Sequence, residues 1–320
     1  MHYYKIIALK IFHSIKDFSS PKKTILTLGT FDGVHIGHKK ILEKVIQNTL
    51  DEKYESAVLT FFPHPRMILQ ERSEIKLLNT ISEKINLLEQ LGIQNLVIHP
   101  FDESFSRLTA EDFVKTVLVE QFKIHKIIIG YDHRFGRNRT ADINNLIEFG
   151  KKYNFEVEQI SAQEINAISV SSTKIRTAIQ EGNMLLANKY LGYDYIVTGT
   201  VSHGKQLGRT IGFPTANLKI EEDYKLIPLK GVYIVSSEIN GQKVYGMMNI
   251  GHNPTVDGED LSIEVHYLDF DGDLYNQKIS VSILKRIRGE EKFESVTLLK
   301  EQIEKDKTLT LSYIKELETK

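Results

Sequence analysis

The sequence predicts two domains of different fold class: an α/β domain with a doubly wound parallel sheet, then a small antiparallel β-barrel with a terminal helix. The 320 residues are enough for about two domains of roughly 150 residues each. From residue 24 to about 180, short β-branched runs alternate with helical periodicity, which is typical of a parallel sheet. From 195 to 287, Asn-Gly and Asp-Gly pairs separate extended runs, which indicates hairpins.

The first domain is predicted to alternate strands and helices. The strands are Thr24–Leu28, Ala57–Phe61, Asn95–Ile98, Lys126–Ile129 and Glu156–Ile160. The helices are Gly37–Leu50, Ser82–Leu91, Ala110–Gln121, Ile143–Tyr153 and Ser172–Gln180. Ser82 and Thr109 are expected N-caps, and Gly92 is expected to end its helix. Because ligands bind beyond the carboxyl ends of parallel strands, the loops that follow these strands form the candidate site.

The pattern changes near residue 182, so we expect domains of residues 1–185 and 186–320. A short helix, Met184–Leu191, is predicted near this boundary, and a charged amphipathic helix from about Glu294 to Leu317. The strands predicted between them are Ile196–Val201, Gly231–Ile239, Lys243–Ile250, Ser262–Leu268 and Lys278–Leu284. Turns are predicted at Asn240-Gly241, Asp257-Gly258 and Asp271-Gly272.

The composition is that of an ordinary soluble globular protein and excludes several kinds of chemistry. With 41 basic and 42 acidic residues the net charge is −1, so we expect no nucleic-acid partner and no membrane partner. The absence of cysteine excludes disulfides, thiol catalysis and cysteine-held metals. No segment reaches the about 20 apolar residues that span a bilayer, and no signal cleavage site follows the N-terminus. We therefore expect a cytoplasmic protein, either a monomer or a weak homo-oligomer.

A phosphate-binding turn is predicted directly after the first strand, in Gly29-Thr30-Phe31-Asp32-Gly33-Val34-His35-Ile36-Gly37-His38. A strand, a glycine turn and a helix in this order point backbone N–H groups and the positive end of the helix into one crevice. His35 and His38 lie three residues apart at the helix start, so both imidazoles can reach the same anion. Gly29, Thr30 and Phe31 complete this candidate nucleotide site.

Three later loops, each after a predicted strand, carry further candidate side chains. These are Pro63, His64 and Pro65 in the first loop, Asp132 and Arg134 in the second, and Ser171, Ser172, Thr173 and Arg176 in the third. Each loop alone is typical of a structural turn or a helix cap. Because the loops follow successive strands of one sheet, we expect them on one crevice rim, and a nucleotide site becomes the favoured interpretation.

A second candidate site lies in the predicted antiparallel part, in a glycine-rich stretch that by itself is also typical of a long hairpin. Thr215 and Asn217 are two residues apart, so in an extended chain both face one way. A hydroxyl and an amide oxygen suit Mg²⁺ bound together with ATP phosphates. Further on, Glu264 alternates with apolar neighbours, which is typical either of a solvent-facing sheet edge or of a general base close to the metal.

The motifs of the first domain resemble the nucleotidylyltransferase superfamily, whose fold is Rossmann-like. Pro-His-Pro-Arg at 63–66 and Gly-x-Asp-x-Arg-Phe-Gly at 130–136 narrow the resemblance to the FMN adenylyltransferase module of prokaryotic bifunctional riboflavin kinase/FAD synthetases. The resemblance implies that His35 and His38 hold the ATP phosphates and stabilise the transition state. It implies that Ser171, Ser172, Thr173 and Arg176 bind the departing pyrophosphate, and that Pro63, His64, Pro65, Asp132 and Arg134 line a flavin and nucleotide pocket. His133 and Thr140-Ala141 depart from the usual family pattern.

The motifs of the second domain, spanning 199–293, resemble the riboflavin kinase module, whose fold is a six-stranded barrel with a C-terminal helix. The residues that carry this resemblance are His203-Gly204, Gly208-Arg209, Gly212-Phe213-Pro214-Thr215-Ala216-Asn217, Gly231-Val232-Tyr233, Asn249-Ile250-Gly251, Pro254-Thr255, Glu264-Val265-His266 and Arg288-x-Glu290-x-x-Phe293. The resemblance implies that Thr215 and Asn217 hold Mg²⁺ with ATP, and that Glu264 is the base for the 5′-hydroxyl of riboflavin. It places Arg288 and its neighbours, Glu290 among them, over the flavin. The remaining ATP or flavin candidates are Gly204, Lys205, Gly208, Arg209, Gly212, Pro214 and Asn249.

Three other interpretations explain the sequence less completely. His-Ile-Gly-His also matches the ATP motif of class I aminoacyl-tRNA synthetases, but the short chain and the balanced charge argue against a tRNA partner. A cytidylyltransferase with one activity would leave residues 199–293 unexplained, and a flavin sensor or storage protein would not explain a metal-ligand motif together with a base. We therefore predict the substrates ATP, riboflavin and FMN, and the products ADP, FAD and pyrophosphate.

Overall fold

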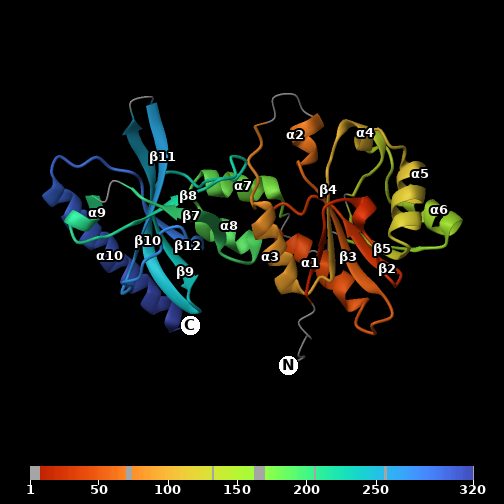
Figure 1. Cartoon of the computed structure of the whole chain (residues 1–320), viewed down its shortest axis with the longest axis horizontal. Coiled ribbons are helices and arrows are strands. Elements are labelled where there is room, and N and C mark those ends of the chain that lie inside the picture. Colours follow the sequence, from red (N-terminus) through yellow and green to blue (C-terminus); the bar gives the residue numbers. More distant parts are fainter. Residues whose placement is uncertain are drawn as a thin grey trace. The chain divides into compact units, whose positions relative to one another are not determined.

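The computed structural model describes residues 8–69, 74–131, 133–161, 170–204, 207–255 and 258–319. The chain forms two compact units, Met1–Ser171 and Ser172–Lys320 (Figure 1). This division lies before the predicted boundary at 185/186, because helices α7 (Ser172–Gln180) and α8 (Met184–Leu191) belong to the second unit. Helix α8 packs against barrel strands of the second unit, and α7 packs against α8.

The first unit is built around a six-stranded sheet in which all neighbouring strands are parallel. The strands are β1 (Lys10–Phe12), β2 (Thr24–Leu28), β3 (Glu55–Phe61), β4 (Asn95–His99), β5 (Ile124–Gly130) and β6 (Glu156–Ile160). Their order is β1-β4-β3-β2-β5-β6. From β2 the chain continues to β3 and β4 on one side and then returns to β5 and β6 on the other. The direction switches between β2 and β5, which is where open sheets of this kind bind ligands.

Strand β2 is central because its sequence suits burial on both faces. All residues of Thr-Ile-Leu-Thr-Leu are buried, as expected for an inner strand of a parallel sheet. Leu26 of β2 and Ile127 of β5 share an apolar core with Val114, Leu118 and Phe122 from the helical segment before β5. The loops at the strand ends are therefore carried by a rigid, well-packed scaffold.

Helices connect the strands of this sheet and pack against it (Figure 1). They are η1 (Ile15–Asp17), α1 (Ile36–Gln47), α2 (Pro65–Leu69), α3 (Ile81–Leu91), α4 (Glu103–Ser106), α5 (Ala110–Asp112), η2 (Phe113–Gln121), η3 (Arg137–Arg139) and α6 (Ile143–Tyr153). Helix α6 has the predicted bounds. The single α-helix predicted at Ala110–Gln121 is instead the short α5, followed by the wider π-helical turns of η2.

The caps of two helices show how local sequence sets their ends. Thr109 caps α5, and Gly92, with φ 89°, ends α3, as predicted. The N-cap of α3 is Thr80, so the prediction of Ser82 was wrong. The Thr80 side chain accepts a hydrogen bond from the Glu83 N–H, and the Glu83 carboxylate accepts one from the Thr80 N–H. This reciprocal capping box gives α3 a firm start next to the predicted phosphate turn.

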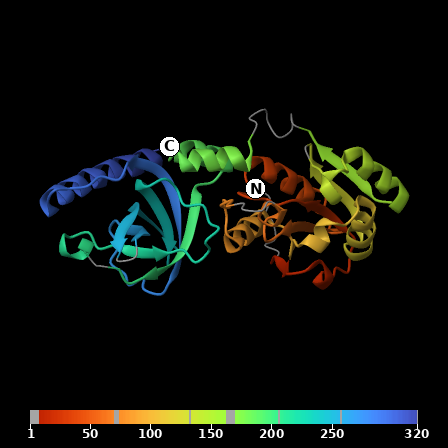
Figure 2. The same cartoon turned by 90° about the horizontal axis from the view of Figure 1, so that it is seen from above.

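The second unit contains a closed antiparallel barrel in the order β10-β11-β8-β7-β12-β9. The strands are β7 (Tyr195–Ser202), β8 (Ala216–Lys219), β9 (Gly231–Ile239), β10 (Gln242–Thr255), β11 (Gly258–Tyr267) and β12 (Lys278–Arg288). The predicted Asn240-Gly241 turn joins β9 and β10, with φ values of 53° and 76°. Helix α9 (Leu207–Thr210) is short, whereas α10 (Val296–Glu318) lies along the outside of the barrel (Figure 2). Across the described ranges, no helix is both long and apolar enough to span a membrane.

Candidate functional site

The loop between β2 and α1 brings two histidines together at the start of a helix. His35 is the N-cap of α1, and its Nδ1 accepts a hydrogen bond from the His38 backbone N–H at 3.4 Å. The two imidazole rings are stacked, with centroids 3.7 Å apart and an interplanar angle of 16°. The Phe31 ring stands edge-on to His38, with centroids 5.2 Å apart. One anion at this helix start can therefore reach both imidazoles.

The backbone of this turn is strained. Phe31 has φ 45° and Val34 has φ 36°, in the left-handed region that residues with side chains seldom adopt. Both side chains are buried, so the surrounding core holds this conformation in place. Gly33, at φ 86°, adopts a similar conformation without strain, and the Gly29 N–H donates to the Leu59 carbonyl at 3.0 Å. Backbone strain held by a rigid core is typical of functional sites.

His38 has an environment that keeps its imidazole neutral. Burial lowers the pKa of His38 well below its usual value, and the neighbouring His35 and Lys84 lower it further. The ring is therefore uncharged near pH 7 in the free protein. Its Nδ1 is buried and has no hydrogen-bond partner within the described part of the chain. A ligand oxygen that binds here would satisfy this atom.

A buried lysine that was not predicted also contacts the turn. Lys84 of α3 is 4% exposed, and its Nζ donates a hydrogen bond to the Thr30 carbonyl oxygen at 2.7 Å. The same oxygen accepts a hydrogen bond from Thr60 Oγ1 at 3.2 Å. Asp32 is also buried, and its Oδ1 accepts a hydrogen bond from the Leu78 N–H at 2.9 Å. The turn is thus fixed to α3 and β3 by several polar contacts.

The proposed flavin-pocket residues lie on two separate loops. His64 is buried between Pro63 and Pro65, the residue that begins α2, and its Nδ1 accepts a backbone hydrogen bond at 3.1 Å. Arg134 is exposed on the loop after β5. Asp132 lies outside the described residues.

The predicted pyrophosphate cluster lies where the two units meet in sequence. Ser171 is the last residue of the first unit, whereas Ser172, Thr173 and Arg176 belong to the first turns of α7 in the second unit. Thr173 is exposed and the other three are partly exposed. Their approach to the histidine turn stays a prediction.

Glu264 is the centre of a second cluster, on the barrel. The Thr215 hydroxyl donates to its Oε2 at 3.0 Å, and the Ser262 hydroxyl donates to its Oε1 at 3.0 Å. A carboxylate that accepts a hydrogen bond at each oxygen is held in one orientation. Ser262 was not predicted, although it lies two residues before Glu264 and therefore on the same face of β11.

Three of the predicted kinase residues lie in one row across neighbouring strands. Asn249 of β10 is paired with Glu264 of β11, and Glu264 is paired with Asn217 of β8. Residues directly opposed in antiparallel strands have side chains on the same face, about 5 Å apart. Ile263 and Val265 alternate with Glu264 and are buried in the barrel. The row therefore lies on the face away from the barrel core, with the carboxylate side chain between two amide side chains.

The glycine-rich loop leaves little room for a Cβ atom at two positions, one beside this row and one within the loop. A Cβ atom at Gly204 would lie 2.1 Å from Nδ2 of Asn217. A Cβ atom at Gly208 would lie 2.1 Å from the carbonyl oxygen of Phe213. The Phe213 N–H donates a hydrogen bond to the Gly208 carbonyl oxygen at 2.8 Å. At Gly208 the atom in the way belongs to the backbone, so glycine is required there. At Gly204 a Cβ atom would instead displace the end of the Asn217 side chain.

The remaining predicted residues of the loop are placed around it. The Pro214 carbonyl oxygen accepts a hydrogen bond from His266 Nδ1 at 2.8 Å, which fastens the loop to β11. Gly212 has φ 90°, a conformation that favours glycine. Arg209 is exposed, and Lys205 lies outside the described residues.

Thr215, Asn217 and Glu264 offer the ligand types that Mg²⁺ prefers. The Thr215 hydroxyl lies 3.0 Å from the Glu264 carboxylate, Asn217 is paired with Glu264 on the neighbouring strand, and only Glu264 carries a charge. Within the described ranges, no group of three or more His, Asp or Glu side chains could hold a metal. The donor set therefore fits a Mg²⁺ ion that takes its other ligands from water and from nucleotide phosphates.

Glu290 lies beside the end of the row. A Cβ atom at Gly251 would lie 2.5 Å from Oε1 of Glu290 and 3.2 Å from Nδ2 of Asn249. The His252 N–H donates to the same Glu290 oxygen at 3.3 Å. Two of the predicted flavin or ATP residues, Asn249 and Glu290, are therefore close to each other.

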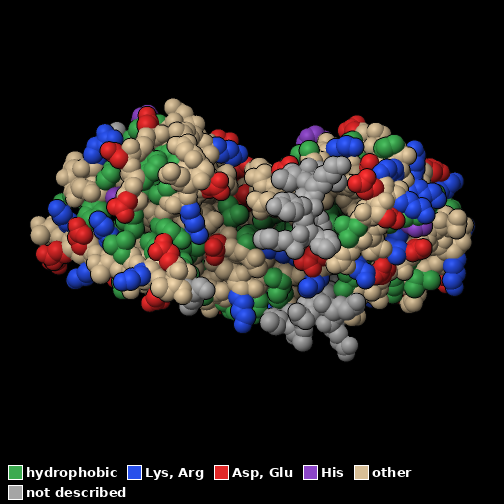
Figure 3. Space-filling model, turned by 90° about the horizontal axis from the view of Figure 1, so that it is seen from below, with side chains coloured by type: hydrophobic (Ala, Val, Ile, Leu, Met, Phe, Trp, Pro, Cys, Tyr) green, Lys and Arg blue, Asp and Glu red, His purple; other side chains and the backbone are tan. Residues whose placement is uncertain are grey.

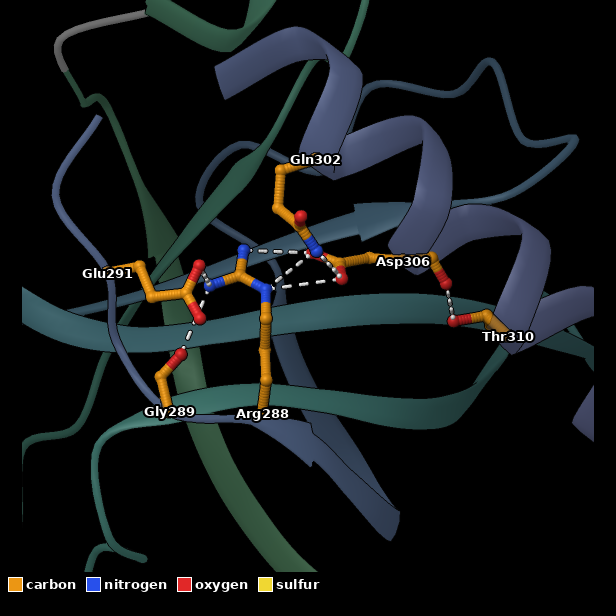
Figure 4. Close-up of polar contacts among 6 residues, drawn as sticks. All are labelled: Arg288, Gly289, Glu291, Gln302, Asp306 and Thr310. Carbon is orange, nitrogen blue, oxygen red and sulfur yellow. Dashed lines mark hydrogen bonds and ion pairs between the residues drawn. The ribbon is translucent and has the colours of Figure 1, made fainter. Parts of the chain in front are cut away.

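Arg288, at the end of β12, is held by the terminal helix (Figure 4). Its Nε donates to both carboxylate oxygens of Asp306, at 3.2 and 3.0 Å, and its Nη2 donates to Oδ2 at 2.9 Å. Asp306 is 2% exposed and also accepts a hydrogen bond from Gln302 Nε2 at 3.0 Å. Arginine–carboxylate pairs of this geometry are strong and directional. Arg288 thus fastens α10 to the barrel, and its placement over a flavin stays a prediction.

Asp306→Ala is expected to lower the free energy of unfolding of the barrel by about 3 kcal/mol, because it removes the buried carboxylate that accepts three hydrogen bonds from the largely buried guanidinium of Arg288. Denaturant unfolding of the full chain measures the change. Glu301→Ala, at an exposed position on the same helix, is the matched control and should stay within about 0.5 kcal/mol of the wild type. Equal stability of the two variants would show that the pair does not hold α10 in place.

Comparison with known proteins finds matches for both parts of the chain. Two family models match it, FAD synthetase over residues 17–174 and riboflavin kinase over residues 191–314. The bifunctional riboflavin kinase/FMN adenylyltransferase of Listeria monocytogenes is 38% identical over 296 residues, 92% of this chain and 93% of that protein. The enzyme of the same name from Bacillus subtilis is 37% identical over 311 residues, 95% of this chain and 96% of that protein. The Escherichia coli K12 enzyme is 35% identical over 301 residues, with coverage of 93% and 96%.

A solved structure is similar over almost the whole chain. It is a crystal structure of a protein named as a macrolide-efflux protein from Streptococcus pneumoniae, with 32% identity, coverage of 95% of this chain and 99% of that chain, and a TM-score of 0.85. That name differs from those of the curated relatives, which agree with both family models. On these matches the chain belongs to the bifunctional riboflavin kinase/FMN adenylyltransferase family.

Proposed function

We propose that the two activities of this family are divided between the two clusters. Riboflavin is phosphorylated at the barrel row around Glu264, and FMN is adenylylated at the turn that holds His35 and His38. One observation carries this assignment: a carboxylate held at both oxygens lies in a row with two amide side chains, in a different unit from the histidine turn. The first arrangement suits a general base at a phosphate site, and the second suits charge stabilisation at a helix start.

In the kinase reaction, the 5′-hydroxyl oxygen of riboflavin attacks the γ-phosphorus of ATP while Glu264 accepts the proton of that hydroxyl. The bond to the β-phosphate oxygen breaks, so FMN and ADP form. The hydroxyls of Thr215 and Ser262 keep the carboxylate in position until the alcohol arrives. The close glycine loop brings backbone N–H groups toward the phosphates, and Arg288 and Glu290 are assigned to the flavin side.

Thr215 and Asn217 are proposed to hold Mg²⁺ together with ATP. The ion, when bound, neutralises phosphate charge and orients the transferred group. The adjacency of the Thr215 hydroxyl to Glu264 supports this assignment, because it puts the proton acceptor next to the phosphate site.

In the adenylyltransferase reaction, the FMN phosphate attacks the α-phosphorus of ATP, and the bond to pyrophosphate breaks to give FAD. The stacked imidazoles of His35 and His38 and the turn from Gly29 to Phe31 are proposed to hold the ATP phosphates. The orphaned Nδ1 of His38 supports this role, since it lacks a hydrogen-bond partner within the described ranges. Ser171, Ser172, Thr173 and Arg176 are assigned to pyrophosphate, and Pro63, His64, Pro65, Asp132 and Arg134 to the flavin and nucleotide pocket.

The protein is proposed to act in the cytoplasm on small molecules, as a monomer or weak homo-oligomer, without nucleic-acid or membrane partners. The absence of cysteine fits a reducing compartment. Acidic and basic side chains are interspersed over the face shown in Figure 3, in keeping with the net charge of −1.

Incubation with ATP, riboflavin and Mg²⁺, followed by chromatography of the products, tests the proposed function. FMN is expected first and FAD second, and FMN supplied alone with ATP should give FAD and pyrophosphate directly. Removal of divalent cations with EDTA should stop FMN formation, and added Mg²⁺ should restore it. Riboflavin that is bound but unchanged would identify a storage protein, and FMN formation that persists in excess EDTA would overturn the metal assignment.

A further inference from the structure

We propose that Lys84 is a positioning residue that supplies a buried, titratable positive charge to the phosphate turn, so that ATP binding for adenylyl transfer depends on protonation of this side chain. The inference rests on the proposed function of the histidine turn and goes beyond it, because Lys84 lies on a helix outside the predicted site. It would set the pH dependence of one of the two activities and leave the other unaffected.

The geometry ties Lys84 to the turn rather than to solvent. Its Nζ lies 2.7 Å from the Thr30 carbonyl oxygen, which belongs to the segment proposed to cradle phosphate. The side chain is buried, and helix α3 is held at its start by the Thr80–Glu83 capping box. Helix α3 therefore holds the ammonium group against the backbone of the turn.

The charged and titratable neighbours of Lys84 show that its charge reaches the site. Burial lowers the pKa of Lys84 to about 8, against the opposing effect of the Asp32 carboxylate. Lys84 in turn contributes to the lowered pKa of His38, as does His35. A charge that acts on the His38 imidazole also acts on an anion bound beside that imidazole.

Folding stability does not explain a charged lysine at this position. Its pKa is lower in the folded chain than in the unfolded chain, so burial of the ammonium opposes folding at pH values below about 8. This cost disappears as pH rises toward the unfolded pKa, because the amine is then neutral in both states. An ionisable group whose charged form lowers the folding stability near neutral pH is typical of functional sites.

ATP binding should reverse part of this effect. The phosphates bring negative charge toward the ammonium, which raises the pKa of Lys84 in the complex and draws in a proton. The value of kcat/KM for ATP, which reports the free enzyme, is expected to fall above pH 8, whereas kcat should fall only at higher pH. In the neutral state the amine still donates to Thr30, so the turn keeps its shape and only the charge is lost.

The test is a pH profile of FMN adenylylation for the full chain, with riboflavin phosphorylation measured in the same preparations. Lys84→Met should lower kcat/KM for ATP about ten-fold at pH 7 and abolish the fall above pH 8. Lys84→Arg keeps a charge at all pH values and should restore activity while also abolishing that fall. Lys40→Met, on the exposed face of α1, is the matched control and should keep the wild-type profile.

Calorimetry of ATP binding at pH 8, in buffers of different ionisation enthalpy, gives a second readout that does not depend on turnover. Wild-type protein and Lys40→Met should take up a proton, and Lys84→Met should take up measurably less. Thermal unfolding confirms that each variant is folded. An alkaline limb that persists in Lys84→Arg, or equal proton uptake in Lys84→Met, would overturn the inference. Failure of the wild type to make FAD would instead overturn the proposed function.

Discussion

Glu264→Gln is expected to lower kcat for riboflavin phosphorylation by about 10²- to 10⁴-fold, the range that a general base contributes. The substitution keeps the size of the side chain and one hydrogen-bond-accepting oxygen, so the row on the barrel face should remain in place. The amide cannot accept the proton of the attacking hydroxyl. Conversion of supplied FMN to FAD should be unchanged, because the histidine turn lies in the other unit.

Chromatography of FMN and FAD from the two half-reactions, measured separately, gives the result. Glu238→Gln is a matched control, since Glu238 is exposed on β9 of the same barrel and is not one of the predicted kinase residues. This control should retain full kinase activity. A Glu264→Gln protein that phosphorylates riboflavin at the wild-type rate would show that another group accepts the proton.

Periodicity and turn chemistry predicted the elements that are stable on local grounds. Strands β2, β6 and β9 and helices α6, α7 and α8 have the predicted bounds, because their apolar pattern and capping residues agree with their tertiary environment. Strands β1 and β8 were not predicted. They have 3 and 4 residues and exist only because a neighbouring strand pairs with them. Such short pieces carry no periodicity of their own.

The sequence did not show which hydrogen bonds form inside a correctly predicted helix or at its start. The buried residues of η2 recur at a spacing of four, which suits i+4 and i+5 bonding alike, so the sequence pattern does not distinguish an α-helix from a π-helix over residues 113–121. Thr80 and Ser82 are equally good caps by residue type. The reciprocal bond with Glu83 selects Thr80, and the three-residue spacing of a capping box could have indicated it.

The sequence predicted residue types of the candidate sites better than their contacts. The two-residue spacing of Thr215 and Asn217 was informative, but the strand register that sets Asn217 and Asn249 on either side of Glu264 depends on the closed barrel. The pairing of Arg288 with Asp306 could not be foreseen, because it joins a strand end to the distant terminal helix.

The position of Lys84 in the sequence pattern could have indicated that it is unusual. It occupies a helical stripe at spacings of three, four and seven residues from Leu87, Leu88 and Leu91, where an apolar residue is expected. A lysine in an apolar stripe is more often a long side chain that reaches solvent. Only the folded chain shows that Lys84 instead ends at the Thr30 carbonyl.

His38→Ala should lower kcat/KM for FMN adenylylation by about 10²- to 10³-fold, the usual effect of removing one group that stabilises developing charge. The imidazole lies at the start of α1 and stacks on His35, so its loss removes both the proposed ATP contact and the packing against the neighbouring ring. Riboflavin phosphorylation should continue at the wild-type rate, and FMN should therefore accumulate without FAD.

The accumulation of FMN distinguishes a lost activity from a lost fold, because the same chain makes it. His13→Ala is the matched control, as His13 is exposed in the same unit and should leave both activities intact. Because His38 is neutral in the free protein, His38→Ala removes no charge near pH 7. The unfolding midpoint of this variant at pH 7 should therefore differ from that of the wild type only by the packing that the imidazole provides. Loss of both activities in folded protein, from either His38→Ala or Glu264→Gln, would overturn the division of the two reactions between two sites.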